Sequence, residues 1–225
     1  AEVPSHPIRP KKLANLMMGL VGGVLIGLLV GYFVELFDQS VRTQEDVENR
    51  LGLPFLGTIP LFQQLAGQPM YQALITPEPS LTGESFRNLR TMIEFACVDD
   101  KARKILVTSS VQAEGKSCVA SNIAVAFAQK GEKVLLIDGD LRRPQLHRNF
   151  KLSSERGLSD FLATGSSVDG IETLVQKTDV PGLEVLVCGT RPPNPSELLN
   201  TPRLGALVSW AGANYQRVIV DCTPM

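Results

Sequence analysis

The sequence predicts an α/β fold, with a parallel β-sheet flanked by helices and preceded by one transmembrane helix. An uncharged apolar run over residues 13–34 predicts the transmembrane helix. Two hydrophobic runs that end in aspartates, residues 134–138 and 217–221, are typical of buried strands in a parallel sheet. Residues 104–131 indicate a short strand, a tight loop and a helix that ends at Gly131, which is one unit of such a sheet.

Composition limits the class of protein. With 225 residues and a net charge of −1, the chain has room for one domain with additional segments and shows no sign of a nucleic-acid partner. Cys97, Cys118, Cys188 and Cys222 lack C-x-x-C spacing and lie in or beside apolar runs, which favours buried, reduced thiols. The chain begins at Ala1 and stops just after an apolar run, so we expect it to be truncated at both ends.

The apolar run is long enough to cross a bilayer, because a helix over it would extend ~33 Å against a hydrocarbon core of ~30 Å. We assign residues 13–37 to this transmembrane helix in a lipid bilayer. Residues 1–12, with prolines at every third position, are expected to form an extended extracytoplasmic stub. The span also has a glycine at every fourth position, which predicts a small-residue face for another helix. These glycines are Gly19, Gly23, Gly27 and Gly31.

Residues 38–80 form a predicted juxtamembrane connector. Thr43 to Asp46 matches a capping box, and Gly52 predicts the end of the helix that follows it. The stretch LPFLGTIP indicates a short extended segment bounded by prolines. Residues 63–80, rich in Gln, Pro and small residues, indicate a linker.

An amphipathic helix is predicted from Glu84 to Ala96. Its polar face carries Glu84, Arg87 and Arg90 three residues apart, which suits either local ion pairs or a contact between subunits. Spacing alone leaves both interpretations open. The apolar stripe consists of Phe86, Leu89, Ile93 and Ala96.

The tight loop, residues 109–118, has the sequence SSVQAEGKSC. It ends like the phosphate-binding loop G-x-x-x-x-G-K-[ST], but Ser110 replaces the first glycine. Gly115 would let the backbone approach the phosphates, Lys116 would reach the β- and γ-phosphates, and Ser117 would bind Mg²⁺. The predicted nucleotide-binding residues are Ser110, Val111, Gln112, Ala113, Glu114, Gly115, Lys116, Ser117, Cys118 and Arg142.

Three carboxylates are expected beside this loop. Asp138 and Asp140 follow one predicted strand, and Asp221 ends another. Because the carboxyl ends of parallel strands share one edge of a sheet, the three should meet the loop there. Together they predict a site for ATP and Mg²⁺ on a P-loop NTPase-like fold.

The nucleotide site also orients the span. Arg9, Lys11 and Lys12 precede the span. Glu35 and Asp38 follow it, so the positive-inside rule would place its N-terminal side in the cytoplasm. ATP is a cytoplasmic metabolite, and we therefore expect the C-terminal side to be cytoplasmic despite the local charges.

Ordered blocks over nearly the whole chain resemble the bacterial tyrosine kinases of polysaccharide co-polymerases, the Wzc-like chain-length determinant family. These blocks are the proline-rich segment with the span, LGLPFLGTIP, ESFRNLRTMIEFA, the Walker A loop, LLIDGDLRRP (Walker A′), RPPNPSELL and VIVDCTP (Walker B). The resemblance implies an ATP-dependent protein-tyrosine autokinase in the bacterial inner membrane. It would form a homo-oligomeric ring, phosphorylate neighbouring subunits, and regulate the polymerisation and export of capsular polysaccharide or exopolysaccharide.

The resemblance also implies roles for single residues. Lys116, Asp138 and Asp140 would be catalytic, with Asp138 orienting or deprotonating the tyrosine hydroxyl. The metal site would consist of Ser117, Asp138 and Asp221, with Asp140 in support.

The family also has an E-x-x-R-x-x-R oligomerisation motif, which Glu84, Arg87 and Arg90 match. This match favours the intersubunit interpretation of the polar helix face. Residues 81–225 would then be the cytoplasmic kinase domain, incomplete at its C-terminal end, and we expect this segment to be inactive alone.

The chain departs from the family in two places. Gln112 and Ala113 replace the Pro-Gly of the usual S-x-P-G-E-G-K-S loop, and alanine would fit there only with a negative φ. The tyrosine-rich tail of the family is missing, and the chain contains only Tyr32, Tyr71 and Tyr215. Tyr32 lies in the span and Tyr215 precedes a core strand, so neither is an attractive acceptor.

Two other functions compete with the kinase. A ParA/MinD-type switch ATPase would carry a signature lysine where this chain has Val111, and would use a C-terminal amphipathic anchor. The second competitor is a non-catalytic co-polymerase scaffold that only binds nucleotide. The intact Lys116, Asp138, Asp140 and Asp221 favour catalysis, but they do not separate phosphotransfer from hydrolysis. A eukaryotic-type kinase is disfavoured because no H-R-D or D-F-G motif is present.

Overall fold

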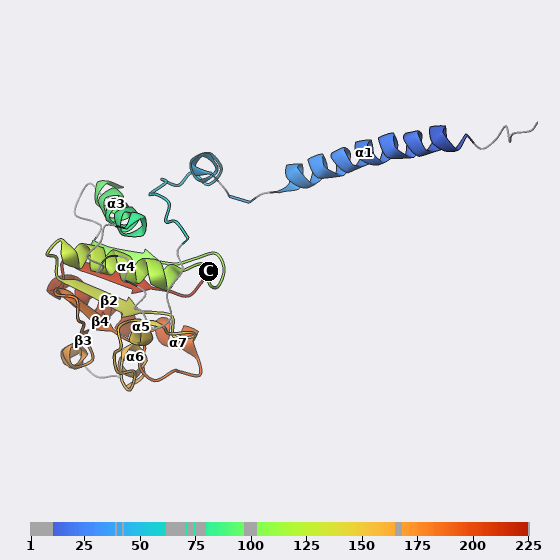
Figure 1. The fold of residues 1–225 in the computed structure, drawn as a ribbon. Helices are drawn as coiled ribbons and strands as arrows, with labels where there is room; N and C mark the ends of the chain where they lie inside the picture. Colours follow the sequence, from blue (N-terminus) through green and yellow to red (C-terminus); the bar gives the residue numbers. More distant parts are fainter. Residues whose placement is uncertain are drawn as a thin grey trace, which may run out of the picture. The chain divides into compact units, whose positions relative to one another are not determined.

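The computed structural model describes residues 11–38, 40–41, 43–61, 71, 74, 80–96, 103–164 and 168–224. The proline-rich segment, most of the predicted linker 63–80 and Cys97 lie outside these residues. The chain divides into two compact units, residues 1–55 and residues 56–225 (Figure 1).

The first unit contains a long helix, α1 (Lys12–Phe37), where the apolar run predicts one. Among the described residues it is the one helix long and apolar enough to cross a membrane, with a mean hydropathy of 2.2. None of its residues is buried, and a Cβ added at Gly19, Gly23, Gly27 or Gly31 would meet no atom within 4 Å. The glycine face is therefore open to close approach by another helix.

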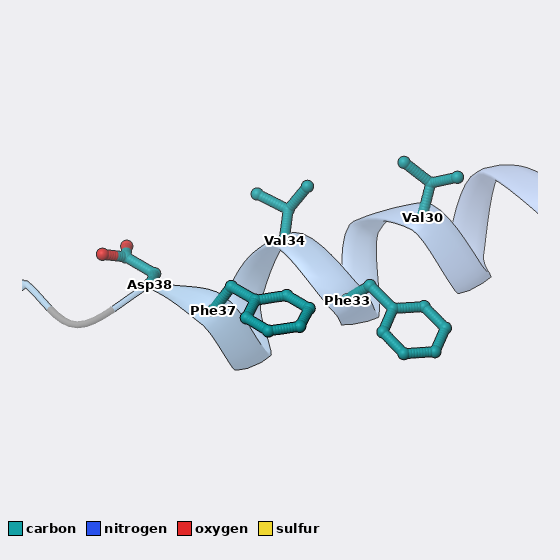
Figure 2. A pocket seen from close by; sticks show the side chains of 5 residues that line it. All are labelled: Val30, Phe33, Val34, Phe37 and Asp38. Atoms are coloured by element: carbon teal, nitrogen blue, oxygen red, sulfur yellow. The ribbon is translucent and has the colours of Figure 1, made fainter.

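At its C-terminal end, α1 borders an open hollow of about 490 Å³ that is lined by Val30, Phe33, Val34, Phe37 and Asp38. Figure 2 shows the two valines on one side of the helix and the two phenylalanines on the other. All five side chains belong to the end of one helix, and Asp38 is the only polar one. The hollow is therefore a feature of an apolar helix surface, and we do not assign it a ligand.

The predicted capping box after α1 is confirmed. The Thr43 N–H and hydroxyl donate to Asp46 Oδ2 (3.1 and 2.9 Å), and the Asp46 N–H donates back to Thr43 Oγ1 (3.2 Å). A π-helical turn, η1 (Asp46–Arg50), follows. The chain leaves this turn at Gly52, as predicted, with a φ of +65° that glycine adopts without a steric penalty.

The second unit is built on a five-stranded sheet with the order β1-β5-β2-β4-β3. Four strands are parallel, as predicted, and the short edge strand β3 is antiparallel to β4. Asp138 and Asp221 end neighbouring strands and lie directly opposite each other in the register. The strands are β1 (Lys104–Val107), β2 (Val134–Asp138), β3 (Gln176–Lys177), β4 (Leu183–Leu186) and β5 (Arg217–Asp221).

Helices cover both faces of the sheet. On one face, α3 (Leu81–Ala96) packs on α4 (Lys116–Gln129), and Leu136 joins their core (Figure 1). On the other face, Leu135 and Ile137 pack with α6 (Leu158–Thr164) and α8 (Pro202–Asn214). Successive strand residues point to opposite faces, so β2 contributes to both cores. The other helices are α5 (Leu146–Asn149), η3 (Val168–Thr173) and α7 (Pro195–Leu199).

Two interactions stabilise the C-terminal end of α4. Gly131, predicted as the helix stop, has a φ of +96°, and its N–H donates back to the last turn. Arg90 of α3 donates to the Ala126 carbonyl at 2.9 Å. This carbonyl is one of those at a helix C-terminus that lack a helical N–H partner. The guanidinium therefore ties α3 to the end of α4.

Candidate active site

The Gly-Lys-Ser loop lies between β1 and α4, which is the context that a phosphate loop requires. Gly115 directly precedes α4 with a left-handed φ of +86°, and Lys116 is the first residue of the helix. The N-terminus of a helix offers free N–H groups and the positive end of its dipole to an anion. The backbone at this position can therefore hold phosphate.

The Glu114 side chain forms hydrogen bonds with the backbone at the start of the loop. Its Oε2 accepts the N–H groups of Ser110 at 2.9 Å and of Val111 at 3.2 Å. The Ser109 hydroxyl also donates to the Val111 carbonyl at 2.8 Å. These hydrogen bonds keep the loop in a tight turn although Gln112 and Ala113 replace the Pro-Gly of the family pattern.

The structure corrects one expectation about this loop. Ala113 has a φ of +65°, whereas we expected alanine to fit only with a negative φ. The chain therefore keeps the left-handed conformation that suits glycine while it carries a Cβ. That conformation costs a residue with a Cβ about 1–2 kcal/mol.

Lys116 lies at the centre of the predicted carboxylate cluster. Its ammonium is 2.7 Å from Asp140 Oδ2 and 3.8 Å from Asp221 Oδ1. It is also 3.5 Å from the Ser117 hydroxyl oxygen. Asp138, opposite Asp221 on the neighbouring strand, completes the group. The structure therefore brings together all the residues that we predicted to be catalytic or to bind the metal.

The three carboxyl groups differ electrostatically. Burial raises the pKa of Asp138 to about 7, and the Leu146 N–H only partly opposes this. Burial also raises the pKa of Asp221, against the Ser117 hydroxyl and the Lys116 ammonium. For Asp140, burial is outweighed by the hydrogen bonds from Lys116 and from the loop backbone, so its pKa is lowered.

The three carboxylates also differ in their hydrogen bonds. Asp140 uses both oxygens, one for Lys116 and one for the Arg143 N–H at 2.9 Å. Asp138 Oδ2 accepts the Leu146 N–H at 3.1 Å. Asp138 Oδ1 and both oxygens of Asp221 are buried and have no hydrogen-bond partner among the described residues. Unpartnered buried oxygens require an explanation, and a cation is one.

These oxygens, of which Asp221 Oδ1 lies 3.8 Å from the Lys116 ammonium, fit Mg²⁺, which prefers oxygen ligands and usually keeps water or phosphate in its coordination shell. Ser117, next to Lys116, is nearly buried and can add its hydroxyl oxygen. The described residues contain no group of three His, Cys, Asp or Glu side chains arranged to hold a metal by themselves. Water or the phosphates of a nucleotide would complete the coordination of Mg²⁺ here.

A cleft of about 1100 Å³ opens over this cluster. Of the predicted nucleotide-binding residues, all except Glu114 line it, and the Glu114 carboxylate is turned into the loop. Asp138 and Asp221 are fully buried and are not part of the lining. The sequence analysis missed other lining residues from the segments that follow β2, β4 and β5. They are Arg143, Gln145, Arg191, Pro192, Pro193, Pro195, Thr223 and Pro224.

The described cysteines form no disulfide, as predicted, but only Cys188 is buried, whereas Cys118 and Cys222 are half-buried. Burial raises the pKa of Cys188 to about 12 and that of Cys222 to about 11, and it also raises the pKa of Cys118 at the cleft. All three thiols therefore stay protonated at neutral pH and are poor nucleophiles.

The predicted oligomerisation residues do not share one environment. Glu84 and Arg87 form a weak, largely exposed ion pair at 3.9 Å. Arg90 instead points to α4 and bonds the Ala126 carbonyl within the same chain. Only Glu84 and Arg87 therefore present exposed charge for a contact with another subunit.

Fold and site together define a P-loop nucleotide-binding domain with acidic residues at the ends of two neighbouring strands. No family model matches the chain. The chain is 32% identical to the tyrosine-protein kinase etk of Escherichia coli (strain K12), over 98% of this chain and 32% of that protein.

Solved structures show the same likeness. The kinase domain of the Escherichia coli tyrosine kinase ETK matches with a TM-score of 0.73 and 34% identity, over 83% of this chain and 74% of that one. The BceF tyrosine kinase domain matches with a TM-score of 0.68 and 38% identity, over 82% and 77%. The chain belongs to the bacterial tyrosine kinases, as the ordered sequence blocks predict. It spans about a third of the length of etk and of other relatives that it matches along its whole length.

Proposed function

We propose that the complete protein is a membrane-anchored, ATP-dependent protein-tyrosine autokinase. The observation that carries this proposal is the meeting of Lys116, Asp140 and Asp221 at a phosphate loop in a chain of this family. α1 would anchor it in the bacterial inner membrane, with the second unit in the cytoplasm where ATP is available.

In this proposal the loop backbone and Lys116 bind the phosphates of ATP, and Lys116 exchanges Asp140 for them. Ser117, Asp138 and Asp221 supply oxygen atoms for Mg²⁺, directly or through water. Mg²⁺, when bound, neutralises charge on the phosphates. Because Asp140 also holds the Arg143 N–H, it keeps its loop in place after Lys116 has moved.

The transfer step forms a bond between the tyrosine oxygen and the γ-phosphorus. The bond from that phosphorus to the bridging oxygen breaks, and ADP leaves with the electron pair. The phenolic proton passes to Asp138, which then binds Mg²⁺ through water and keeps its Oδ1 for the proton. Because Asp138 is buried, one water molecule would carry the proton to it.

The acceptor tyrosines are proposed to lie on neighbouring subunits of a homo-oligomeric ring. Tyr71 and Tyr215 are 5% and 6% exposed, so phosphorylation of either would require local unfolding. Glu84 and Arg87 carry exposed charge for the subunit contact. Control of polysaccharide polymerisation and export is the role that the family resemblance implies.

The decisive experiment incubates the full-length protein with labelled ATP and probes for phosphotyrosine. Wild type should label itself, and Lys116→Met should lose at least 100-fold in rate. Lys130→Met is the matched control, since Lys130 is an exposed lysine at the other end of α4, paired with Glu94. Phosphotyrosine that does not depend on Lys116 would contradict the proposal. ATP hydrolysis without phosphotyrosine would support a switch ATPase, and nucleotide binding alone would support a scaffold.

A further inference from the structure

The cleft has an excess of positive charge. Four basic side chains line it, Lys116, Arg142, Arg143 and Arg191, against the single carboxylate of Asp140. The chain as a whole carries a net charge of −1, so this excess is local. It lies around the mouth of the proposed nucleotide site.

Among the described residues, no carboxylate neutralises the three arginines. Lys116 is paired with Asp140, but no described acidic side chain lies within ion-pair distance of Arg142, Arg143 or Arg191. All three are exposed at the cleft. Their charge is available to a ligand.

Arg143 is held at a fixed distance from the reaction centre. Its N–H donates to Asp140 Oδ1 at 2.9 Å, and the same carboxylate binds Lys116 through its other oxygen. One buried side chain thus fixes both the phosphate-binding lysine and the backbone that carries Arg143.

A separate set of hydrogen bonds fixes the backbone next to Arg191. Asp160 Oδ2 accepts the N–H groups of Gly157 at 2.8 Å and of Thr190 at 3.2 Å. The two chain segments approach so closely that a Cβ on Gly189 would lie 2.2 Å from that oxygen. Arg191 is the next residue after Thr190, so these hydrogen bonds fix the position of its backbone.

The wall beside Arg191 is apolar and stiff. Pro192, Pro193 and Pro195 line the cleft there. Proline rings restrict the backbone and offer a flat apolar surface against which an aromatic side chain can pack. The cleft therefore places a surface for a ring next to cations for carboxylates.

We propose that Arg143 and Arg191 bind acidic residues that flank the acceptor tyrosine, so that the preferred substrate is a tyrosine in an acidic segment. Lys116, the α4 N-terminus and Arg142 bind the nucleotide phosphates in the proposed function. The guanidinium groups of Arg143 and Arg191 are therefore available to bind the substrate. A guanidinium forms two parallel hydrogen bonds with a carboxylate, which gives orientation as well as charge pairing. This inference rests on the proposed kinase function and names its substrate class.

The test measures binding before it measures transfer. A fluorescent peptide with phenylalanine in place of tyrosine and glutamates on both sides is titrated into the full-length protein with MgADP. Its matched peptide carries glutamine for every glutamate. We expect the acidic peptide to bind at least 10-fold more tightly, and this preference to shrink as salt rises from 50 to 500 mM.

Variants then assign the preference to the two arginines. Arg143→Gln combined with Arg191→Gln should remove most of the preference, while the affinity for a fluorescent ADP analogue changes less than 2-fold. Arg148→Gln, at an exposed arginine of α5 outside the cleft lining, should change neither value.

Several results would overturn the inference. They are equal binding of both peptides, a preference that survives the double variant, and a loss of ADP affinity as large as the loss of peptide affinity. Because the phenylalanine peptide cannot be phosphorylated, these outcomes do not depend on kinase activity. Failure of the proposed function would appear separately, as absent phosphotyrosine on the matching tyrosine peptide and on the protein itself.

Discussion

Among single residues, Asp138 should govern the response of the ligand-free protein to pH. Its pKa is raised from 3.8 to about 7, so the folded state favours the protonated carboxyl. This contribution to stability is complete below pH 3.8 and is lost as the pH rises through about 7. The pKa of Asp221 is raised in the same direction and adds to the effect.

Asp138→Asn removes this titration without a change in size. Without nucleotide or Mg²⁺, we expect the variant to be more stable than wild type at pH 8 by on the order of 2 kcal/mol, and nearly equal to it at pH 4. Urea unfolding at the two pH values measures the difference. Asp179→Asn, at an exposed aspartate, is the control. An equal pH response in wild type and Asp138→Asn would show that the buried carboxyl is not the cause.

Ala113 gives a second prediction for a single residue. Glycine has no steric penalty at a φ of +65°, so Ala113→Gly should stabilise the protein by about 0.5–1 kcal/mol after the added freedom of the unfolded chain is counted. Ala113→Val should destabilise it, because a β-branched residue is strained at this φ. Lys151→Gly tests the same effect at a φ of +54° outside the cleft lining. A lower melting temperature for Ala113→Gly would refute this account of the loop.

Among the elements, α3 and α4 depend on Arg90. The bond from its guanidinium to the Ala126 carbonyl crosses a part-buried contact, and a hydrogen bond from a charged group contributes about 1.5–3 kcal/mol. We therefore expect Arg90→Ala to lower the free energy of unfolding by about that amount. Arg87→Ala, which breaks only an exposed pair, should cost less than about 0.5 kcal/mol.

Urea denaturation and analytical sedimentation together test whether Arg90 acts on stability and Arg87 on subunit association. Arg87→Ala should weaken subunit association without loss of stability, whereas Arg90→Ala should lose stability first. Equal losses of stability in the two variants would show that Arg87 and Arg90 act alike.

The elements up to β2, and β5 at the end, could be predicted from hydrophobic periodicity and from the positions of glycine and proline, whereas the helices and strands between β2 and β5 were missed. The runs that end at Asp138 and Asp221 are apolar throughout, as buried parallel strands are, and Gly131 marks the end of α4. β4 was missed because it is four residues long and carries Glu184 among its apolar residues. That glutamate is paired with the Tyr215 hydroxyl, a contact between distant segments that no local pattern reveals.

The missed strand explains the missed site residues that follow it, Arg191 and the prolines beside it. Once β4 is known to be parallel to β2, the loop that carries Arg191 must emerge at the same edge as the phosphate loop. The closure of that loop by Glu114 and the turn of Arg90 toward α4 depend on tertiary packing. Spacing could place the three motif residues on one helix but could not tell which of them faces a neighbour.

For the whole molecule, the chain joins an exposed apolar helix to an α/β unit. Because α1 has no buried residue and a mean hydropathy of 2.2, we expect this 225-residue chain to stay in the membrane pellet after alkaline carbonate extraction. Deletion of residues 12–37 should release it into the supernatant. Deletion of residues 1–10 is the control and should leave it in the pellet. Full release of the intact chain would contradict a spanning α1.

The bond between Arg90 and the end of α4 also has a practical consequence for anyone who shortens this protein. A version that starts at β1 would retain the phosphate loop, its three aspartates and the entire sheet. It would nevertheless lose the cap on α4 and uncover Phe127, which is fully buried in the core shared with α3. Soluble expression therefore requires a start point upstream of Leu81, and solubility of the two versions can be compared directly.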